Sequence, residues 1–231
     1  ISNIEKFKTQ NLFESSNYET ILNYLNSLKA IRGYFFNEFS PEGEPTNTKR
    51  PRKYFSAKNA AKIDAIRKEI KNLKNKKIVT EYEHSLLLHD LIMAVNDIAN
   101  IAGTYGHYLS KFVKRAEAPI LLYPSSFSNI GKLGGHKVYR GYAEDVAHKL
   151  TGDICYIDPP YIKRQYAANY HILETLARED EPEAIGDSGL RPWRDQYSNF
   201  CSKVKIRSSF DKILTQINCD DFLISYSEDG L

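Results

Sequence analysis

A short apolar run that stops at two prolines constrains the fold of this chain more than any other feature. The run covers residues 154–157, and it is followed directly by Asp158, Pro159, Pro160 and Tyr161. Because proline fixes φ and has no backbone N–H, neither proline can extend a strand ladder. The pattern predicts a buried strand that ends at a stiff loop, where the Asp158 carboxylate is presented beside an aromatic ring.

Strand-like and helical segments alternate around this run. The strand-like runs lie at residues 137–142, 153–160 and 219–230, and the expected helices lie at residues 143–150 and 170–177. Such alternation favours βαβ units and a parallel sheet. In open parallel sheets, functional groups collect beyond the carboxyl ends of the strands, so Asp158 is expected at the functional edge.

The first half of the chain is predicted to be mostly helical. Apolar residues recur at helical spacing in segments at residues 18–28, 57–77 and 81–103. Ser56 is the expected N-cap of the second segment, and Thr80 with Glu83 forms a capping box at the start of the third. Residues 37–53 are rich in proline, glycine and polar residues and end in a cluster of cations, so they are expected to form an exposed loop.

The composition is that of an ordinary globular protein. The chain has 231 residues, of which 42% are hydrophobic and 26% charged, so it has room for one large domain or two small ones. Its net charge of +3 permits an anionic partner without requiring one. The most apolar segment, residues 85–95, is short and contains His89 and Asp90, so it is expected to be a core helix and not a membrane span.

The cysteines and histidines show no pattern typical of a disulfide framework or a metal site. The cysteines are odd in number and widely spaced, at Cys155, Cys201 and Cys219. Free thiols and a cytoplasmic location are therefore expected. The histidines have no ligand spacing, so no metal is expected.

The sequence Asp-Pro-Pro-Tyr after an apolar strand resembles the hallmark of the DNA N6-adenine methyltransferases. The segments "GTYGHYLSKFVKRA" (103–116), "RQYAANYHILETLA" (164–177) and "SYSEDGL" (225–231) resemble one type II restriction-modification subgroup of that family. The resemblance covers essentially the whole chain. It implies an α/β fold with a partial, Rossmann-like, mostly parallel sheet and a helical target-recognition insert. Residues 1–120 would form the recognition region and residues 121–231 the catalytic part.

The resemblance implies methyl transfer from S-adenosylmethionine to adenine N6 in double-stranded DNA, within a restriction-modification system. Asp158 and the Pro159 carbonyl would accept hydrogen bonds from the adenine amine, with Pro160 completing the stiff turn, and Tyr161 would stack on the flipped base. Acceptors aimed at both N–H groups stabilise the positive charge that develops on the amine as the methyl group arrives. The structural alternative is a strand-terminating turn over which the tyrosine packs.

The resemblance also implies positions for the cofactor and the target base. Gly141 and Tyr142 occupy the place of the segment that contacts the adenine end of S-adenosylmethionine, and Asp158 lies beside the cofactor. Family members often carry an aspartate at this place, at or beside which this chain has Gly141 and Tyr142, and Asp145 lies a little later. Tyr166 and Tyr170 either form part of the target-base site or are tyrosines that pack a helix.

Several cations and aromatic residues are candidates for DNA contacts. Lys163 and Arg164 either touch phosphates or belong to a solvated face. In the recognition region, the candidates are the basic residues 49–53 together with Tyr105, His107, Lys111, Lys114 and Arg115.

The Gly-rich cofactor turn of the family, an aromatic-x-Gly-x-Gly sequence between a strand and a helix, is not found in the sequence, and the chain opens with Ile1. The sequence is therefore expected to start after that motif, and a second polypeptide would supply it. On this hypothesis residues 1–231 alone bind S-adenosylmethionine weakly. The alternatives are a DNA-binding fragment without catalysis and a helical scaffold in which Asp-Pro-Pro-Tyr is only a turn.

Overall fold

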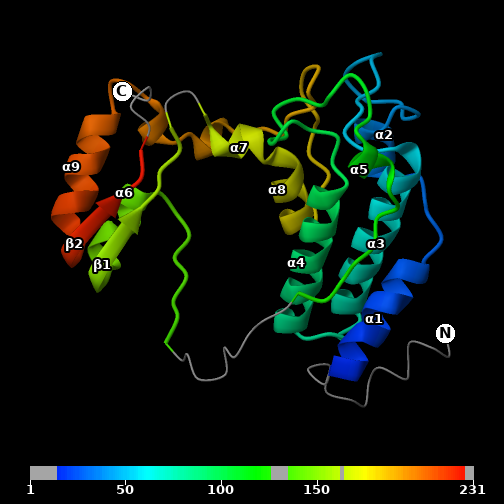
Figure 1. Ribbon diagram of the computed structural model, residues 1–231, viewed down its shortest axis with the longest axis horizontal. Coiled ribbons are helices and arrows are strands. Elements are labelled where there is room, and N and C mark those ends of the chain that lie inside the picture. The colour runs from blue at the N-terminus through cyan, green and yellow to red at the C-terminus, as the bar shows by residue number, and fades with distance from the viewer. Residues whose placement is uncertain (1–14, 126–134, 162–163, 227–231) are drawn as a thin grey trace. The chain divides into compact units, whose positions relative to one another are not determined.

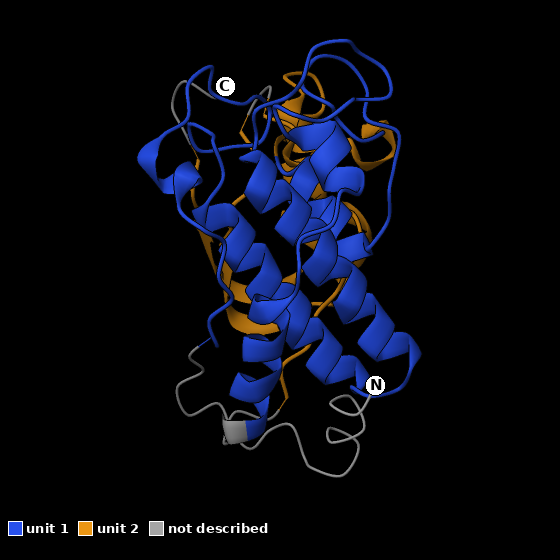
Figure 2. Cartoon of the chain, turned by 90° about the vertical axis from the view of Figure 1, so that its right-hand side faces the viewer, with its two compact units in different colours: residues 1–126, 170–192 blue, residues 127–169, 193–231 orange. Residues whose placement is uncertain are grey.

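The computed structural model of the protein describes residues 15–125, 135–161 and 164–226 (Figure 1). The chain divides into two compact units (Figure 2). Unit 1 comprises residues 1–126 and 170–192, and unit 2 comprises residues 127–169 and 193–231. Residues 170–192, which the expected boundary after residue 120 assigns to the catalytic part, pack in unit 1.

Unit 1 is helical. Its helices are α1 (Ser15–Ser27), α2 (Tyr34–Phe39), α3 (Ala57–Asn75), α4 (Glu81–Asp97), α5 (Lys114–Glu117) and α8 (His171–Arg178). The predicted caps are confirmed, since the Ser56 side chain accepts a hydrogen bond from the Asn59 N–H, and Thr80 with Glu83 forms the capping box of α4. Neither α4 nor any other helix within the described ranges is long and apolar enough to cross a membrane.

The core of unit 1 is formed by the apolar faces of the long helices and by the aromatic side chains of α2. In α3, Ile63, Ile66 and Ile70 follow helical spacing and have no exposed surface. Burial of each such side chain contributes about 1.5–3 kcal/mol to folding. Asp64, on the same helix, accepts hydrogen bonds from the backbone N–H groups of Gly33, Phe35 and Phe36. Its carboxylate thereby stabilises the start of the short helix α2.

Helix α4 ends at Asp97, earlier than the expected end near Gly103. The chain turns after Asp97 because the fully buried Asn100 side chain bonds to the backbone of Lys53 and of Leu109 and Val113 in the segment that follows. An asparagine amide that satisfies backbone groups in this way competes with continuation of a helix.

Unit 2 contains a small parallel sheet, so the protein combines helices and strands. Strand β1 (Thr151–Ile157) pairs with β2 (Asn218–Ile224), from Thr151 opposite Asn218 to Ile157 opposite Ile224. The remaining elements of the unit are α6 (Ala143–Val146), η3 (Ala147–Lys149), α7 (Tyr166–Asn169), η4 (Arg194–Gln196), η5 (Asn199–Cys201) and α9 (Ile206–Gln216). The expected parallel pairing is confirmed.

The connection from β1 to β2 contains α9, a helix that was not among the predicted elements although Ile206, Phe210 and Ile213 follow helical spacing. Ile206 and Ile213 of α9 pack in one apolar cluster with Ile157 of β1 and Phe200 of η5. The opposite face of the sheet carries Ile154, Tyr156 and Leu223, which are 70%, 60% and 61% exposed within the described residues. The prediction of a buried strand is therefore correct only near its end, where Ile157 is buried and Cys155 half-buried, whereas the other residues of β1 are exposed.

The predicted strand at residues 137–142 is wrong. In the structure these residues form no ladder with any described segment, and Val138 is 96% exposed. A strand needs a partner for its backbone groups, whereas alternating apolar residues alone do not supply one. The helix predicted directly after it is confirmed, as α6 and η3.

The buried imidazole of His171 makes the stability of unit 1 depend on pH. His171 has no exposed surface, its Nε2 lies 3.0 Å from the Tyr105 carbonyl oxygen, and burial lowers its pKa to about 4. The unfolded chain, with a His pKa of about 6.5, binds more protons between these values, so stability falls as pH drops from about 6.5 towards 4.

We expect the free energy of unfolding to decrease by about 2 kcal/mol between about pH 7 and pH 5 because of this group. Urea unfolding at the two pH values measures it. In the His171→Gln variant, which lacks the titrating group, the change should be smaller by that amount. An equal pH dependence in both proteins would contradict the assignment.

Candidate functional site

The loop after β1 presents an exposed carboxylate at the end of a strand. Ile157, the last residue of β1, is buried and pairs with Ile224, and Asp158 follows it with an exposed side chain. Pro159 is buried and Pro160 half-buried. Among the described residues, no hydrogen bond or ion pair engages the Asp158 carboxylate. The strand thus ends at Ile157, as the two prolines that follow indicate, and the Asp158 carboxylate remains available to a ligand.

Tyr161 is attached to the end of the neighbouring strand. Its hydroxyl lies 3.3 Å from Ser225 Oγ, and its ring packs edge-to-face on Tyr226 with 5.1 Å between centroids. The Ser225 N–H in turn donates to the Ile157 carbonyl at 2.9 Å. Asp158 and Tyr161 are therefore held at the shared carboxyl edge of β1 and β2, the edge at which parallel sheets place their ligands.

A buried glutamine and a cysteine fix the far side of this loop. The Gln165 amide donates to the Ser198 carbonyl at 3.1 Å and accepts from the Ser198 N–H at 2.9 Å. The Cys201 thiol lies 3.4 Å from the Arg164 carbonyl, and burial raises its pKa. Neither residue is predicted in this role from the sequence, since each bonds to backbone that is distant along the chain and no local pattern indicates such a bond.

Two of the residues expected to contact the cofactor, Gly141 and Tyr142, lie directly before α6. Gly141 has φ +154°, a conformation that side chains rarely adopt, and Tyr142 is 43% exposed. The Tyr142 hydroxyl donates to the Asp195 carbonyl, and the residue lines a polar pocket of about 480 Å³. The buried Glu144 carboxylate also lines the pocket and accepts a hydrogen bond from Ser209 Oγ at 2.7 Å. Asp158 does not line it.

The residues expected near the target base are exposed but belong to different units. Tyr166 begins α7 in unit 2 and is 45% exposed, whereas Tyr170 precedes α8 in unit 1 and is 39% exposed. Arg164 is exposed, and Lys163 lies outside the described residues. The roles assigned to these side chains remain predictions.

In unit 1, the structure brings together the two basic segments that were expected to contact DNA. The Asn100 amide donates to the carbonyls of Lys53 and Leu109, both at 2.9 Å, and Lys53 Nζ donates to the Ser110 carbonyl at 3.2 Å. We call the result the cationic loop surface, formed by Lys49, Arg50, Lys53, Lys111, Lys114 and Arg115. In the part of the chain that the structure describes, none of these cations forms an ion pair.

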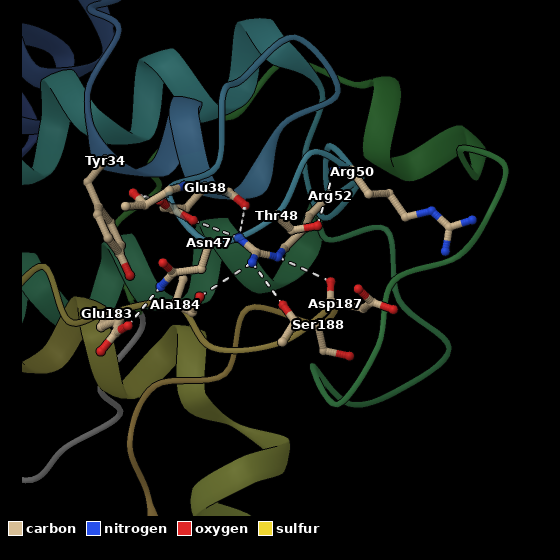
Figure 3. Close-up of polar contacts among 12 residues, drawn as sticks. Tyr34, Glu38, Asn47, Thr48, Arg50, Arg52, Glu183, Ala184, Asp187 and Ser188 are labelled. Atoms are coloured by element: carbon tan, nitrogen blue, oxygen red, sulfur yellow. Dashed lines mark hydrogen bonds and ion pairs between the residues drawn. The ribbon is translucent and has the colours of Figure 1, made fainter.

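Two members of the predicted DNA-contacting set are buried, and the prediction is wrong for both. Tyr105 has no exposed surface, and its ring stacks on that of Tyr54 with 6.3 Å between the ring centroids. Its hydroxyl donates a hydrogen bond to the Asn96 side chain. Arg52 is also fully buried and forms an ion pair with Glu38 at 2.6 Å (Figure 3). Arg50 points away from this cluster, as expected for a residue of an exposed basic loop (Figure 3).

Comparison with protein families identifies the chain. Residues 7–229 match the family described as D12 class N6 adenine-specific DNA methyltransferase. The chain belongs to this family. The D12 class match spans both units and includes the Asp158 loop and the cationic loop surface.

Curated members of the family are similar to the chain. It is 42% identical over 180 residues to type II methyltransferase M.FokI of Planomicrobium okeanokoites, a match covering 78% of this chain and 28% of that protein. It is 37% identical over 180 residues to type II methyltransferase M.NlaIII of Neisseria lactamica, covering 78% of this chain and 53% of that protein. Modification methylase StsI of Streptococcus sanguinis is 33% identical over 213 residues, with 91% and 31% covered. The chain thus spans about a quarter to half of these relatives' lengths. No solved structure matches it.

The anchoring of the D12 class Asp158 loop through Gln165 can be tested by stability. Gln165→Ala leaves the Ser198 N–H and carbonyl without their partner, and each unsatisfied buried group costs about 1–3 kcal/mol. We expect urea unfolding to show a loss of at least about 1 kcal/mol. Gln216→Ala, at an exposed position of α9, is the matched control and should change stability little. Equal stability of the two variants would show that the amide does not hold the loop.

The buried Arg52–Glu38 pair gives a second stability prediction. Glu38→Ala leaves the Arg52 guanidinium buried without its counter-charge, which costs about 3–5 kcal/mol in comparable pairs. Glu42→Ala, an exposed carboxylate of the following loop, should be nearly neutral. Thermal and urea unfolding measure both. A Glu38→Ala protein as stable as the Glu42→Ala protein would contradict the pairing.

Proposed function

We propose that the protein transfers a methyl group from S-adenosylmethionine to adenine N6 in a specific duplex DNA sequence, as the modification enzyme of a restriction-modification system. The observation that carries this proposal is the Asp158 carboxylate, exposed and without an intramolecular partner among the described residues, on a loop in which Tyr161 and Gln165 bond to neighbouring segments. Membership of the D12 class supports the same conclusion.

In the proposed mechanism, Asp158 and the Pro159 carbonyl accept hydrogen bonds from the two N–H groups of the adenine amine. The amine is a poor nucleophile because its lone pair is delocalised into the ring. Acceptors on both N–H groups favour a pyramidal nitrogen and stabilise the charge that develops on it. The cofactor, when bound, would supply an electrophilic methyl group and leave as S-adenosylhomocysteine, while the amine would lose one proton to solvent. The stiffness conferred by Pro159 and Pro160 would hold the amine nitrogen, through its two acceptors, in the position that receives the methyl group.

The target adenine must leave the duplex before it can reach Asp158. Tyr161, held beside the carboxylate by Ser225 and Tyr226, would stack on the extruded base, and Tyr166 of the same unit would contribute to its surroundings. Stacking of a base on an aromatic side chain contributes about 1–3 kcal/mol.

Gly141 and Tyr142 would bind the adenine end of the cofactor, with Asp158 beside its reactive end. The residues present fit that use in one respect: the Tyr142 ring is partly exposed at the rim of a pocket, so an aromatic surface is available for a flat ligand.

The proposed division of labour follows the family and not the two compact units, since residues 170–192 pack in unit 1. The helical residues 1–120 would form the target-recognition region, and residues 121–231, with β1 and β2, would form part of a Rossmann-like catalytic sheet. The cationic loop surface would bind phosphates, together with Lys163 and Arg164. The free thiols suit a cytoplasmic enzyme.

The test is Asp158→Ala in the protein that contains this chain. We expect methylation of duplex DNA to be lost while DNA binding is retained, because the carboxylate acts on the reacting amine and not on the duplex. Labelled methyl transfer and a gel shift measure the two properties. Asp153→Ala, an exposed aspartate on the same strand, is the control. A rate for Asp158→Ala within about tenfold of the parent would contradict the role, since comparable contacts are worth about a hundredfold or more.

A further inference from the structure

A tight turn at residues 185–190 projects polar side chains from unit 1. The turn is closed by an antiparallel bridge between Ile185 and Leu190, and it uses Gly186 and Gly189 at φ +69° and +66°. Only glycine adopts these conformations without strain. The Asp187 side chain at its tip is exposed, and no described residue hydrogen-bonds to its carboxylate.

The buried Arg52 side chain holds this turn by bonding to the backbone of the turn (Figure 3). Its guanidinium donates to the carbonyl oxygens of Gly186 at 2.9 Å and Asp187 at 3.1 Å. Gly189 lies so close that an added Cβ would be 2.7 Å from Arg52 Nε. On its other side Arg52 pairs with Glu38, so a fully buried ion pair determines the position of an exposed turn.

The same turn orients an exposed histidine. His107 Nδ1 lies 2.9 Å from Ser188 Oγ, and the imidazole stacks on Tyr108 with 4.6 Å between ring centroids. The buried Tyr54 hydroxyl donates to the Ser188 carbonyl at 3.0 Å, which fixes the backbone that carries the serine. His107 therefore presents its remaining ring nitrogen, Nε2, in a defined direction.

Asp187 and His107 differ in chemistry from the cations of the cationic loop surface, which are proposed to bind phosphates. His107 lies in the same loop as Lys111, which belongs to the cationic loop surface. Asp187, in contrast, carries a negative charge that a phosphate would repel. A carboxylate accepts hydrogen bonds from the exocyclic amino groups of cytosine or adenine, and an imidazole nitrogen bonds to base edges in a groove. Preorganised side chains of this kind lose little entropy on binding.

We propose that Asp187 and His107 are specificity-determining residues that contact base edges of the target sequence. Ser188 is a positioning residue that orients His107, and Arg52 is a positioning residue that holds the turn carrying Asp187. The inference rests on the proposed function, because it assigns sequence discrimination to one surface of the proposed methyltransferase.

The experiment uses the protein that contains this chain, S-adenosylmethionine and a library of duplexes with a randomised segment, followed by sequencing of the methylated sites. The parent protein defines the recognised sequence. In Asp187→Asn and in His107→Ala, discrimination at one base position should fall by about five- to a hundredfold. Ser188→Ala should relax the same position as His107→Ala, a coincidence that a merely structural role would not produce.

Lys111→Ala is the matched control. As a phosphate contact it should lower methylation of all sequences alike and weaken the salt dependence of binding, with the recognised sequence unchanged. Asp187 is exposed and asparagine has nearly the same shape, so the Asp187→Asn protein should have the same thermal unfolding midpoint as the parent. A change in its sequence discrimination would then not result from a folding defect.

The outcomes separate the two proposals. A parent protein that methylates no duplex would overturn the proposed function and with it this inference. A parent that methylates a defined sequence, with Asp187→Asn and His107→Ala variants that keep its full discrimination, would overturn this inference alone.

Discussion

The ion pair between Arg52 and Glu38 is the interaction on which the organisation of unit 1 depends most. Both side chains are almost completely removed from water, and moving two charges out of water costs several kcal/mol each. The pair is tolerated because every side of the guanidinium finds an acceptor, in Glu38 or in the carbonyls of residues 184–187. Its consequence is geometric: α2 and the turn before Leu190, far apart in sequence, are held in one arrangement.

The loop after β1 shows the same principle in unit 2 with a different outcome. Tyr161 and Gln165 bond to neighbouring segments, whereas Asp158 between the strand and these anchors is bonded to no described residue. A rigid frame around an unsatisfied carboxylate means that a ligand does not need to order the acceptor when it binds. Such preorganisation is the main way in which proteins stabilise charge that develops during a reaction.

Much of the local structure could be predicted from the sequence. The Ser56 cap, the Thr80 capping box and the strand that ends before Asp158 were all correct, because each depends on residues that are neighbours in the chain. The predicted strand at residues 137–142 failed and α9 was missed. A short run of strand-forming residues cannot show whether a partner strand exists. Helix α9 was missed although the sequence carries its signal, since Ile206, Phe210, Ile213 and Leu214 follow helical spacing and pack on one side.

The sequence by itself determined the Asp158 loop and the family, since short motifs carry both. Only the tertiary structure decided which side chains face solvent: Arg52 and Tyr105 belong to sequences typical of an exposed surface, yet both are buried. It also joined residues 49–53 to residues 107–115 through Asn100, and placed His107 against Ser188. The physical reason is that these contacts depend on partners as distant as 134 residues along the chain, as for Arg52 and Gly186, and no local pattern encodes such a distance.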